Sequence, residues 1–331
     1  MRYGQETVEP PMHKLLIFLV MPPEVTRRYG ELVSRLFPDL TVEVVRTRED
    51  AETAIADADI LLTFGVMMTD RILARARRLK WVHALGTGVD GIVDQPSLPP
   101  NVTVTSTRGI HGVPMTEATI MLMLALSRKF PRSLRLQDQA VWERWPSRLL
   151  HNKTVGILGI GLIAEHLAPV CKAFGMNVIG ISRTPRHVPG IDRHFGRDAL
   201  IEAVRLLDYF VLLVPYSPET HNIVDATVFA AMKPDSYLIN VARGGVVDEA
   251  ALLDALKTGR IAGAALDTFA TEPLPPDDPL WKAPNTIITP HLGGFCDVYV
   301  EHALPQFESN MRQFVAGNFD GMINIDRRGE P

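Results

Sequence analysis

Short apolar runs alternate with helix-like stretches along nearly the whole chain, in two successive series. The first series, from Lys14 to Ser106, contains the apolar runs LLIFLV, TVEVV, DILLTF and VTVTS, with stretches of helical period between them. The second series begins with TVGILGIGLIAEHL and continues through YFVLLVP, SYLINVA and TIITP. Strands that alternate with helices form parallel sheets with helices on both faces. We therefore predict an α/β protein built on two doubly wound parallel sheets.

A long apolar stretch, VPMTEATIMLMLALSRKF, separates the two series and predicts a helix at the boundary between two domains. The chain of 331 residues is 46% hydrophobic, which is enough apolar material for two ordinary cores. After the second series, a helix from Val298 to about Val315 leads to a tail that can return to the first domain. We predict a discontinuous first domain of residues 1–112 and 297–331 and a second domain of residues 113–296.

The segment from Pro131 to Asn152 fits neither series. It carries Trp142, Trp145 and several arginines without a clean helical or strand period. Two interpretations of this segment stay open. It is either an arm that packs on another subunit or a loop that lies on its own domain.

Composition argues against several classes of partner. Charged residues make up 22% of the chain and the net charge is −4. The chain therefore lacks the excess of basic residues that would indicate binding to nucleic acid or to an anionic membrane surface. The apolar run LLIFLV is too short to span a bilayer. Cys171 and Cys296 are the two cysteines, which is too few for a disulfide framework or a cysteine-based zinc site, and the histidines are scattered. We expect a cytoplasmic, metal-free protein with a small-molecule partner.

A glycine-rich turn opens the second series. Gly159, Gly161 and Ala164 follow the apolar run TVGIL and precede a helix-like stretch, which is the context of a dinucleotide-binding GxGxx(G/A) motif. Gly159 permits the tight turn, Gly161 lets a pyrophosphate approach the backbone, and Ala164 leaves room for helix–strand packing. We expect the backbone N–H groups of Leu162 and Ile163 to bind the pyrophosphate. Glycines also end strands in proteins that bind nothing, but spacing and context together favour a cofactor site.

The residues after the next strand, NVIGIS, indicate which nucleotide is bound. In NAD-binding sites an acidic residue about 20 residues beyond the glycines binds the ribose 2′-hydroxyl. Here the strand ends in Ser182, Arg183, Thr184 and Arg186, and the first acidic residue beyond the motif helix is Asp192. A guanidinium matches the geometry and charge of a 2′-phosphate. We therefore predict a preference for NADP(H), with NAD(H) possible; the alternative is a solvated basic turn without a nucleotide role.

Three further segments carry polar residues at the ends of predicted strands, where ligands bind in α/β sheets. They are INVARGGVVDEAAL, ALDTFATEP and ITPHLGG. Their order and content resemble the D-isomer-specific 2-hydroxyacid dehydrogenase family, and the resemblance extends from about residue 14 to residue 325. The family signatures are matched by Asn240–Gly244 with Asp248–Glu249, by Leu266–Asp267 with Glu272–Pro273, and by Thr289–His291. Within the family, the chain is most similar to the NADP(H)-dependent glyoxylate/hydroxypyruvate reductase type.

The resemblance implies a role for each of three residues. Arg243 would bind the substrate carboxylate and polarise its keto oxygen, because a guanidinium offers planar, bidentate recognition. His291 would donate a proton to that oxygen as hydride arrives and take it back in the reverse direction. Glu272 would hydrogen-bond to His291, favour the imidazolium and fix its tautomer. The implied fold is a flavodoxin-like substrate-binding domain and a Rossmann dinucleotide-binding domain with a cleft between them.

The resemblance also implies ligand contacts beyond these three residues. Thr87 and Gly88, in the turn LGTGVDG, correspond to the family loop whose backbone N–H groups grip the substrate carboxylate. His83, Arg108 and His111 are left out of the catalytic set, and His83 is expected to pack in the core. The implied cofactor contacts are those of the glycine motif (Gly159, Gly161, Leu162, Ile163), of the basic turn (Ser182, Arg183, Thr184, Arg186) and of the later loops (Pro215, Ala242, Asp267, His291, Gly293).

Departures from the family pattern narrow the range of substrates that we expect. No lysine or arginine occurs between Leu85 and Gly91, and the extension of many 3-phosphoglycerate dehydrogenases is absent, so we expect glyoxylate or hydroxypyruvate as substrate. Larger keto acids are alternative substrates. An NAD-dependent enzyme of the same family that acts on phosphoglycerate, D-lactate, formate or phosphite is a further alternative. A non-catalytic dinucleotide sensor or corepressor is the alternative from another class. Family members are usually dimers, so the resemblance implies a homodimer.

Overall fold

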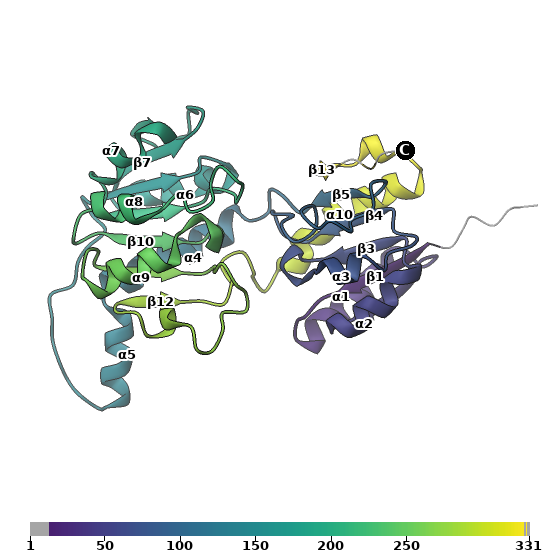
Figure 1. Ribbon diagram of the computed structural model, residues 1–331, viewed down its shortest axis with the longest axis horizontal. Helices are drawn as coiled ribbons and strands as arrows, with labels where there is room; N and C mark the ends of the chain where they lie inside the picture. Colours follow the sequence, from purple (N-terminus) through teal and green to yellow (C-terminus); the bar gives the residue numbers. More distant parts are fainter. Residues whose placement is uncertain (1–12, 328, 330–331) are drawn as a thin grey trace, which may run out of the picture. The chain divides into compact units, whose positions relative to one another are not determined.

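The computed structural model describes residues 13–327 and residue 329. These residues fall into two compact units, and the chain crosses from one unit to the other after Ile110 and again after Asp297. The crossings lie within two residues of the domain bounds predicted from the sequence. Each unit is built on one sheet (Figure 1).

The sheet of the first unit has six strands. They are β1 (Lys14–Phe18), β2 (Thr41–Val45), β3 (Ile60–Thr63), β4 (Trp81–Ala84), β5 (Thr103–Ser106) and β13 (Ile325–Arg327). The neighbours β2-β1-β3-β4-β5 pair in parallel, in the order of flavodoxin-like sheets. Strand β13 pairs antiparallel with β5 and so adds a last strand at that edge, which was not predicted. The prediction of a parallel-sheet α/β unit is otherwise confirmed.

The helices of the first unit are α1 (Pro23–Leu36), α2 (Arg48–Ala54), α3 (Asp70–Leu73) and α10 (Tyr299–Val315). Helix α3 is only four residues long, although the stretch DRILARARRL in which it lies has a helical period. The chain leaves this helix early because tight turn hydrogen bonds follow it and Arg78 then pairs with the buried carboxylate of Asp59 at 3.2 Å. Helix α10 covers the sheet, with the ring of Phe307 stacked on Trp81 at a centroid distance of 5.3 Å.

The sheet of the second unit has seven strands, all parallel. They are β6 (Thr154–Leu158), β7 (Asn177–Ser182), β8 (Arg193–Gly196), β9 (Tyr209–Leu212), β10 (Tyr237–Asn240), β11 (Gly263–Leu266) and β12 (Thr286–Ile288). Their order, β12-β11-β10-β9-β6-β7-β8, extends the Rossmann order by one strand, so the predicted Rossmann fold is confirmed. Strand β8 was not predicted, because this edge strand includes Arg193 and His194 and has no apolar run.

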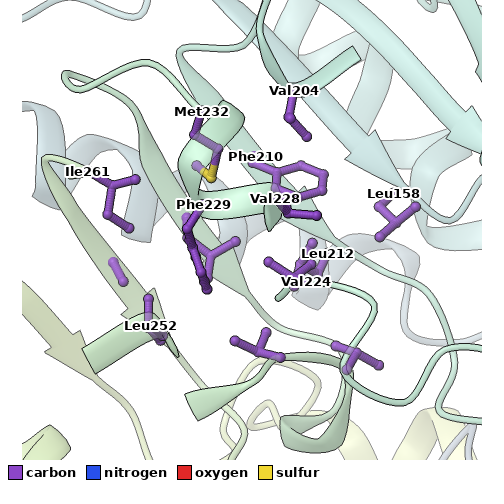
Figure 2. Close-up of a cluster of buried hydrophobic side chains, with 14 of the residues drawn as sticks. Leu158, Val204, Phe210, Leu212, Val224, Val228, Phe229, Met232, Leu252 and Ile261 are labelled. Atoms are coloured by element: carbon purple, nitrogen blue, oxygen red, sulfur yellow. The ribbon is translucent and has the colours of Figure 1, made fainter. Parts of the chain in front are cut away.

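Helices cover both faces of this second sheet. They are α4 (Gly112–Ser127), α5 (Phe130–Asp138), α6 (Leu162–Ala173), α7 (Leu200–Val204), α8 (Ala226–Ala231) and α9 (Glu249–Lys257). Alternate residues of β9 enter two separate cores: Phe210 and Leu212 pack with α7, α8 and α9 (Figure 2), whereas Tyr209 and Val211 pack with α4 and α6. Among the described residues, no helix combines the length and apolar character needed to cross a membrane.

The segment from 131 to 152 is more regular than its sequence suggested. Most of α5 lies within it, and Pro131 stands in the first turn of that helix, where its missing N–H costs no hydrogen bond. No residue of α5 is buried. The chain beyond it is irregular, and the side chain of Trp142 is 91% exposed. Figure 1 shows α5 and this irregular chain standing clear of their sheet.

A buried histidine lies on the central strands of the first unit. Trp81 Nε1 donates to Thr105 Oγ1 at 2.9 Å, which leaves the Thr105 proton for Nδ1 of His83 at 2.8 Å. The Thr107 hydroxyl donates to the carbonyl of Ala84, so it accepts from His83 Nε2 at 3.0 Å. The neutral ring is thereby satisfied, and burial lowers the pKa of His83 from 6.5 to about 3. His83 packs in the core, as expected.

We expect the free energy of unfolding to fall as the pH is lowered from about 6.5 towards 3, because the unfolded chain binds a proton at His83 that the folded chain resists. His83→Gln should reduce this dependence, measured as urea unfolding at about pH 7 and about pH 5. His187→Gln, at an exposed histidine, is the control. Identical pH dependence in the wild type and in the His83 variant would contradict the assignment.

Candidate active site

The carboxyl ends of three neighbouring strands bring the candidate catalytic residues together. Strands β10, β11 and β12 lie side by side in the sheet of the second unit. Arg243 follows the end of β10, Glu272 follows β11 and His291 follows β12. Because parallel strands end at the same edge of a sheet, residues far apart in sequence meet there. This is the edge at which ligands bind in open α/β sheets.

Glu272 and His291 form a direct hydrogen bond. The distance from His291 Nδ1 to Glu272 Oε2 is 2.7 Å, and the second carboxylate oxygen accepts from the backbone N–H of Phe269 at 3.0 Å. Burial alone would raise the pKa of Glu272. The contacts to His291 and Phe269 and the charge of Arg243 outweigh burial, so the pKa of this carboxyl lies below its ordinary value. Glu272 therefore stays ionised at neutral pH and holds the ring.

The contact to Glu272 also fixes the tautomer of His291. With the carboxylate on Nδ1, the Nδ1–H donates to it and Nε2 is left for a substrate. The side chain of His291 is 33% exposed. Its backbone has φ of +54°, a left-handed conformation that non-glycine residues adopt rarely and that clusters at functional sites.

A buried carboxylate organises the turn that carries His291. Asp267 is 2% exposed and accepts from Thr289 Oγ1 at 2.5 Å, from Leu292 N at 2.9 Å and from Gly293 N at 2.8 Å. Its backbone carbonyl also accepts from His291 N at 2.9 Å. Asp267 was predicted to contact the cofactor, and that role stays a prediction. The contacts of the structure give it a different task, which is to shape the residue 289–293 turn.

Arg243 extends from a tight turn after β10. The side-chain amide of Asn240 donates to the carbonyl of Arg243 at 3.0 Å and accepts from Ala242 N at 3.1 Å, which fixes the backbone on both sides. The positive charge of Arg243 acts on two titratable neighbours, Glu272 and His111. Burial, with a further contribution from Arg243, lowers the pKa of His111 to about 4. His111 is therefore neutral at neutral pH.

The glycine turn between β6 and α6 fits a pyrophosphate. Gly159 has φ of +101°, and a Cβ there would lie 2.6 Å from Val214 N, so glycine is required. No atom lies within 4 Å of a Cβ built on Gly161, which leaves the backbone open to a ligand. Helix α6 begins at Leu162 without a side-chain cap. The binding of a pyrophosphate by its first N–H groups stays a prediction. Pro215 follows β9 on the same edge.

The basic turn after β7 is shaped by residues that sequence patterns did not identify. The Ser182 hydroxyl donates to Thr184 O at 2.7 Å and so accepts from His194 Nε2 at 2.8 Å, from the unpredicted strand β8. Arg186 pairs with Glu165 in the first turn of α6. Arg183 is exposed.

The first acidic residue after the motif helix lies away from this turn. Asp192 pairs with Lys172 at 2.8 Å and accepts from the backbone N–H of Val178 at 2.8 Å, near the start of β7. The ribose site lies at the other end of that strand. Asp192 is therefore not placed to bind a 2′-hydroxyl.

Two of the predicted substrate contacts lie in the first unit. Thr87 and Gly88 follow β4 in an irregular turn, and their role in gripping a carboxylate stays a prediction. Across residues 13–327, no group of three or more His, Cys, Asp or Glu side chains is arranged to hold a metal ion.

The chain is similar to known proteins along most of its length. Residues 120–293 match the D-isomer specific 2-hydroxyacid dehydrogenase, NAD binding domain. Glyoxylate/hydroxypyruvate reductase A of Serratia proteamaculans is 36% identical over 264 residues, which are 77% of this chain and 83% of that protein. D-3-phosphoglycerate dehydrogenase of Methanocaldococcus jannaschii is 33% identical over 290 residues, which are 84% of this chain and 55% of that protein. The chain thus spans about half the length of that second relative.

A solved structure shows the same fold with a nucleotide. The NADPH-dependent glyoxylate/hydroxypyruvate reductase of Sinorhizobium meliloti, in complex with NADP and sulfate, matches with a TM-score of 0.80 at 27% identity. The match covers 95% of this chain and 98% of that chain. Together with the match over residues 120–293, these similarities place the protein: it belongs to the D-isomer-specific 2-hydroxyacid dehydrogenase family.

Proposed function

We propose that the protein is an NADP(H)-preferring reductase of small 2-keto acids such as glyoxylate or hydroxypyruvate. The observation that carries the proposal is the 2.7 Å contact between His291 Nδ1 and Glu272 Oε2, in the same unit as the glycine turn. A dinucleotide sensor needs the turn but has no use for a proton donor held by a carboxylate. The pair therefore favours an enzyme over a sensor or corepressor.

Three residues of the second unit have separate roles in the proposed reaction. A reduced nicotinamide, when bound, supplies hydride to the keto carbon. His291 donates the proton on Nε2 to the keto oxygen, which becomes the hydroxyl of the product. Glu272 stabilises the imidazolium before this transfer, and the partly exposed ring regains its proton from solvent. Arg243 binds the substrate carboxylate and polarises the carbonyl.

The basic turn supports the preference for the phosphorylated nucleotide. Arg183 is exposed at the end of β7, where a ribose 2′-phosphate binds in this type of fold. Arg186 already has an acidic partner in Glu165, so we assign the larger share of the discrimination to Arg183. The solved reductase from Sinorhizobium meliloti, which is named NADPH-dependent and contains NADP, is consistent with this assignment.

The substrate class is supported by similarity and by charge. The Serratia proteamaculans relative is named for glyoxylate and hydroxypyruvate. Residues 85–91, the predicted substrate loop, contain no lysine or arginine to bind a substrate phosphate. The similar Methanocaldococcus jannaschii protein is named for 3-phosphoglycerate, so NAD-dependent oxidation of that compound is the second candidate.

Replacing His291 tests the proton donor. We expect His291→Asn to lower kcat for glyoxylate reduction by about 10²- to 10⁴-fold, because the positioned acid is lost. Asparagine is chosen because it tolerates the left-handed backbone at this position. Binding of NADPH, followed by its fluorescence, should persist in the variant. Turnover close to that of the wild type would refute the assignment.

Replacing Arg183 tests the cofactor preference. We expect the wild type to show a higher kcat/KM with NADPH than with NADH. Arg183→Gln should lower the ratio of these two values by about 10- to 100-fold, the value of one charge-assisted hydrogen bond. Arg205→Gln removes an exposed charge from the same unit and is the matched control. The cofactor assignment fails if the wild type favours NADH, and it also fails if both variants behave alike.

We further propose that the protein is a homodimer. Val113, Met121 and Phe130 are each more than half exposed, and they line a cavity of about 670 Å³ beside α4 and α6. Apolar side chains that are exposed side by side are a feature of many protein–protein interfaces. The arm, which we define as α5 with residues 139–149, leaves the same surface and exposes Trp142. We assign this surface to a second copy of the chain, as the family resemblance implies.

Light scattering after size exclusion tests the dimer. We expect the wild type to show twice the mass of one chain at micromolar concentration. Phe130→Glu should shift the protein to the mass of one chain, because a charge cannot be desolvated in an apolar interface. Leu206→Glu changes another exposed apolar residue of the same unit and should leave the dimer intact. A monomeric wild type would overturn the proposal.

A further inference from the structure

Helix α9 begins with two acidic residues that follow the Arg243 turn. Asp248 caps the helix, because its side chain accepts from the backbone N–H of Ala251 at 3.0 Å. Glu249 is the first helical residue, and capping does not require its side chain. The roles assigned so far to Arg243, Glu272 and His291 do not use Glu249 either.

The carboxylate of Glu249 leaves its own helix and reaches the loop between β11 and Glu272. Glu249 Oε1 accepts from the backbone N–H of Ala270 at 2.8 Å. The side chain is half-buried, and burial raises the pKa of Glu249 despite this hydrogen bond, with Asp278 and Glu272 adding negative charge nearby. Burial makes a carboxylate in this position electrostatically costly, and the hydrogen bond from Ala270 offsets part of that cost.

The backbone of Phe269 and Ala270 is held from three directions. Phe269 N donates to Glu272 Oε1 at 3.0 Å, and Ala270 N donates to Glu249. On the third side, Gly244 lies so close that a Cβ there would be 1.8 Å from the carbonyl carbon of Phe269. The turn that follows Arg243 and the loop that carries Glu272 thus meet at these two residues.

We propose that Glu249 is a positioning residue for the catalytic pair. By accepting from Ala270 N–H, it fixes the loop from which Glu272 reaches His291. The inference rests on the proposed function, since it concerns the same site. Glu249 acts through the backbone of residues 269–272, which it contacts by the hydrogen bond from Ala270 N.

Two substitutions distinguish the effect of the length of the Glu249 side chain from the effect of its charge. Glu249→Gln keeps the length of the side chain and an oxygen that accepts a hydrogen bond, but it removes the charge. Glu249→Asp keeps the charge but is one methylene shorter, so it does not reach Ala270. Asp254→Asn, at an exposed position of the same helix, is the control for loss of an acidic charge.

We expect Glu249→Asp to lower kcat for glyoxylate reduction about tenfold, which corresponds to about 1.4 kcal/mol. Its KM for NADPH should stay near that of the wild type. Glu249→Gln should restore most of kcat. A merely structural role would lower thermal stability without this split between kcat and KM and without rescue by Glu249→Gln.

Hydrogen exchange supplies a readout that does not depend on turnover. We expect the Ala270 amide to exchange faster in Glu249→Asp than in the wild type or in Glu249→Gln. The inference is overturned if Glu249→Asp behaves like Asp254→Asn, or if Glu249→Gln is as impaired as Glu249→Asp, since the hydrogen bond to Ala270 would then not account for the effect. A wild type that reduces no keto acid with either nucleotide would instead overturn the proposed function.

Discussion

The buried carboxylate of Asp267 fixes the turn on which the proposed proton donor lies. Three donors, the Thr289 hydroxyl and two backbone N–H groups, satisfy a charge that would otherwise be costly in the interior. These contacts hold His291 in a left-handed backbone conformation, which an unsupported chain avoids. The orientation of the ring towards Glu272 depends on this backbone, and the proposed chemistry depends on the ring.

The parallel sheet supplies the rest of the geometry. Strands β10, β11 and β12 end at one edge, so Arg243, Glu272 and His291 lie on three neighbouring loops. The loops are also joined to one another, because Gly244 packs on Phe269 and Glu249 binds Ala270. A displacement of one loop is therefore transmitted to the others. This coupling explains why a residue such as Glu249 can matter without contacting the reacting atoms.

Sequence patterns predicted the buried strands and the glycine turn, because apolar runs and glycine spacing are local signals. They also singled out Arg243, Glu272 and His291 at strand ends, and the catalytic role of these residues stays a prediction. The patterns missed β8, whose edge position lets Arg193 and His194 stand in a strand, and α5, which buries no face. They also missed the antiparallel β13 and the contacts of Asp267, Glu249 and Glu165. Each of these contacts joins residues that only tertiary packing brings together, so no local pattern records it.

The most direct test of the account follows the hydride itself. NADPH carrying deuterium at the transferred position of C4 is incubated with the protein and glyoxylate, and the products are examined by mass spectrometry. The account predicts glycolate with one deuterium on carbon 2, formed in equal amount to oxidised nucleotide. Oxidation of the nucleotide without deuterium in glycolate, or no oxidation with any 2-keto acid, would contradict it.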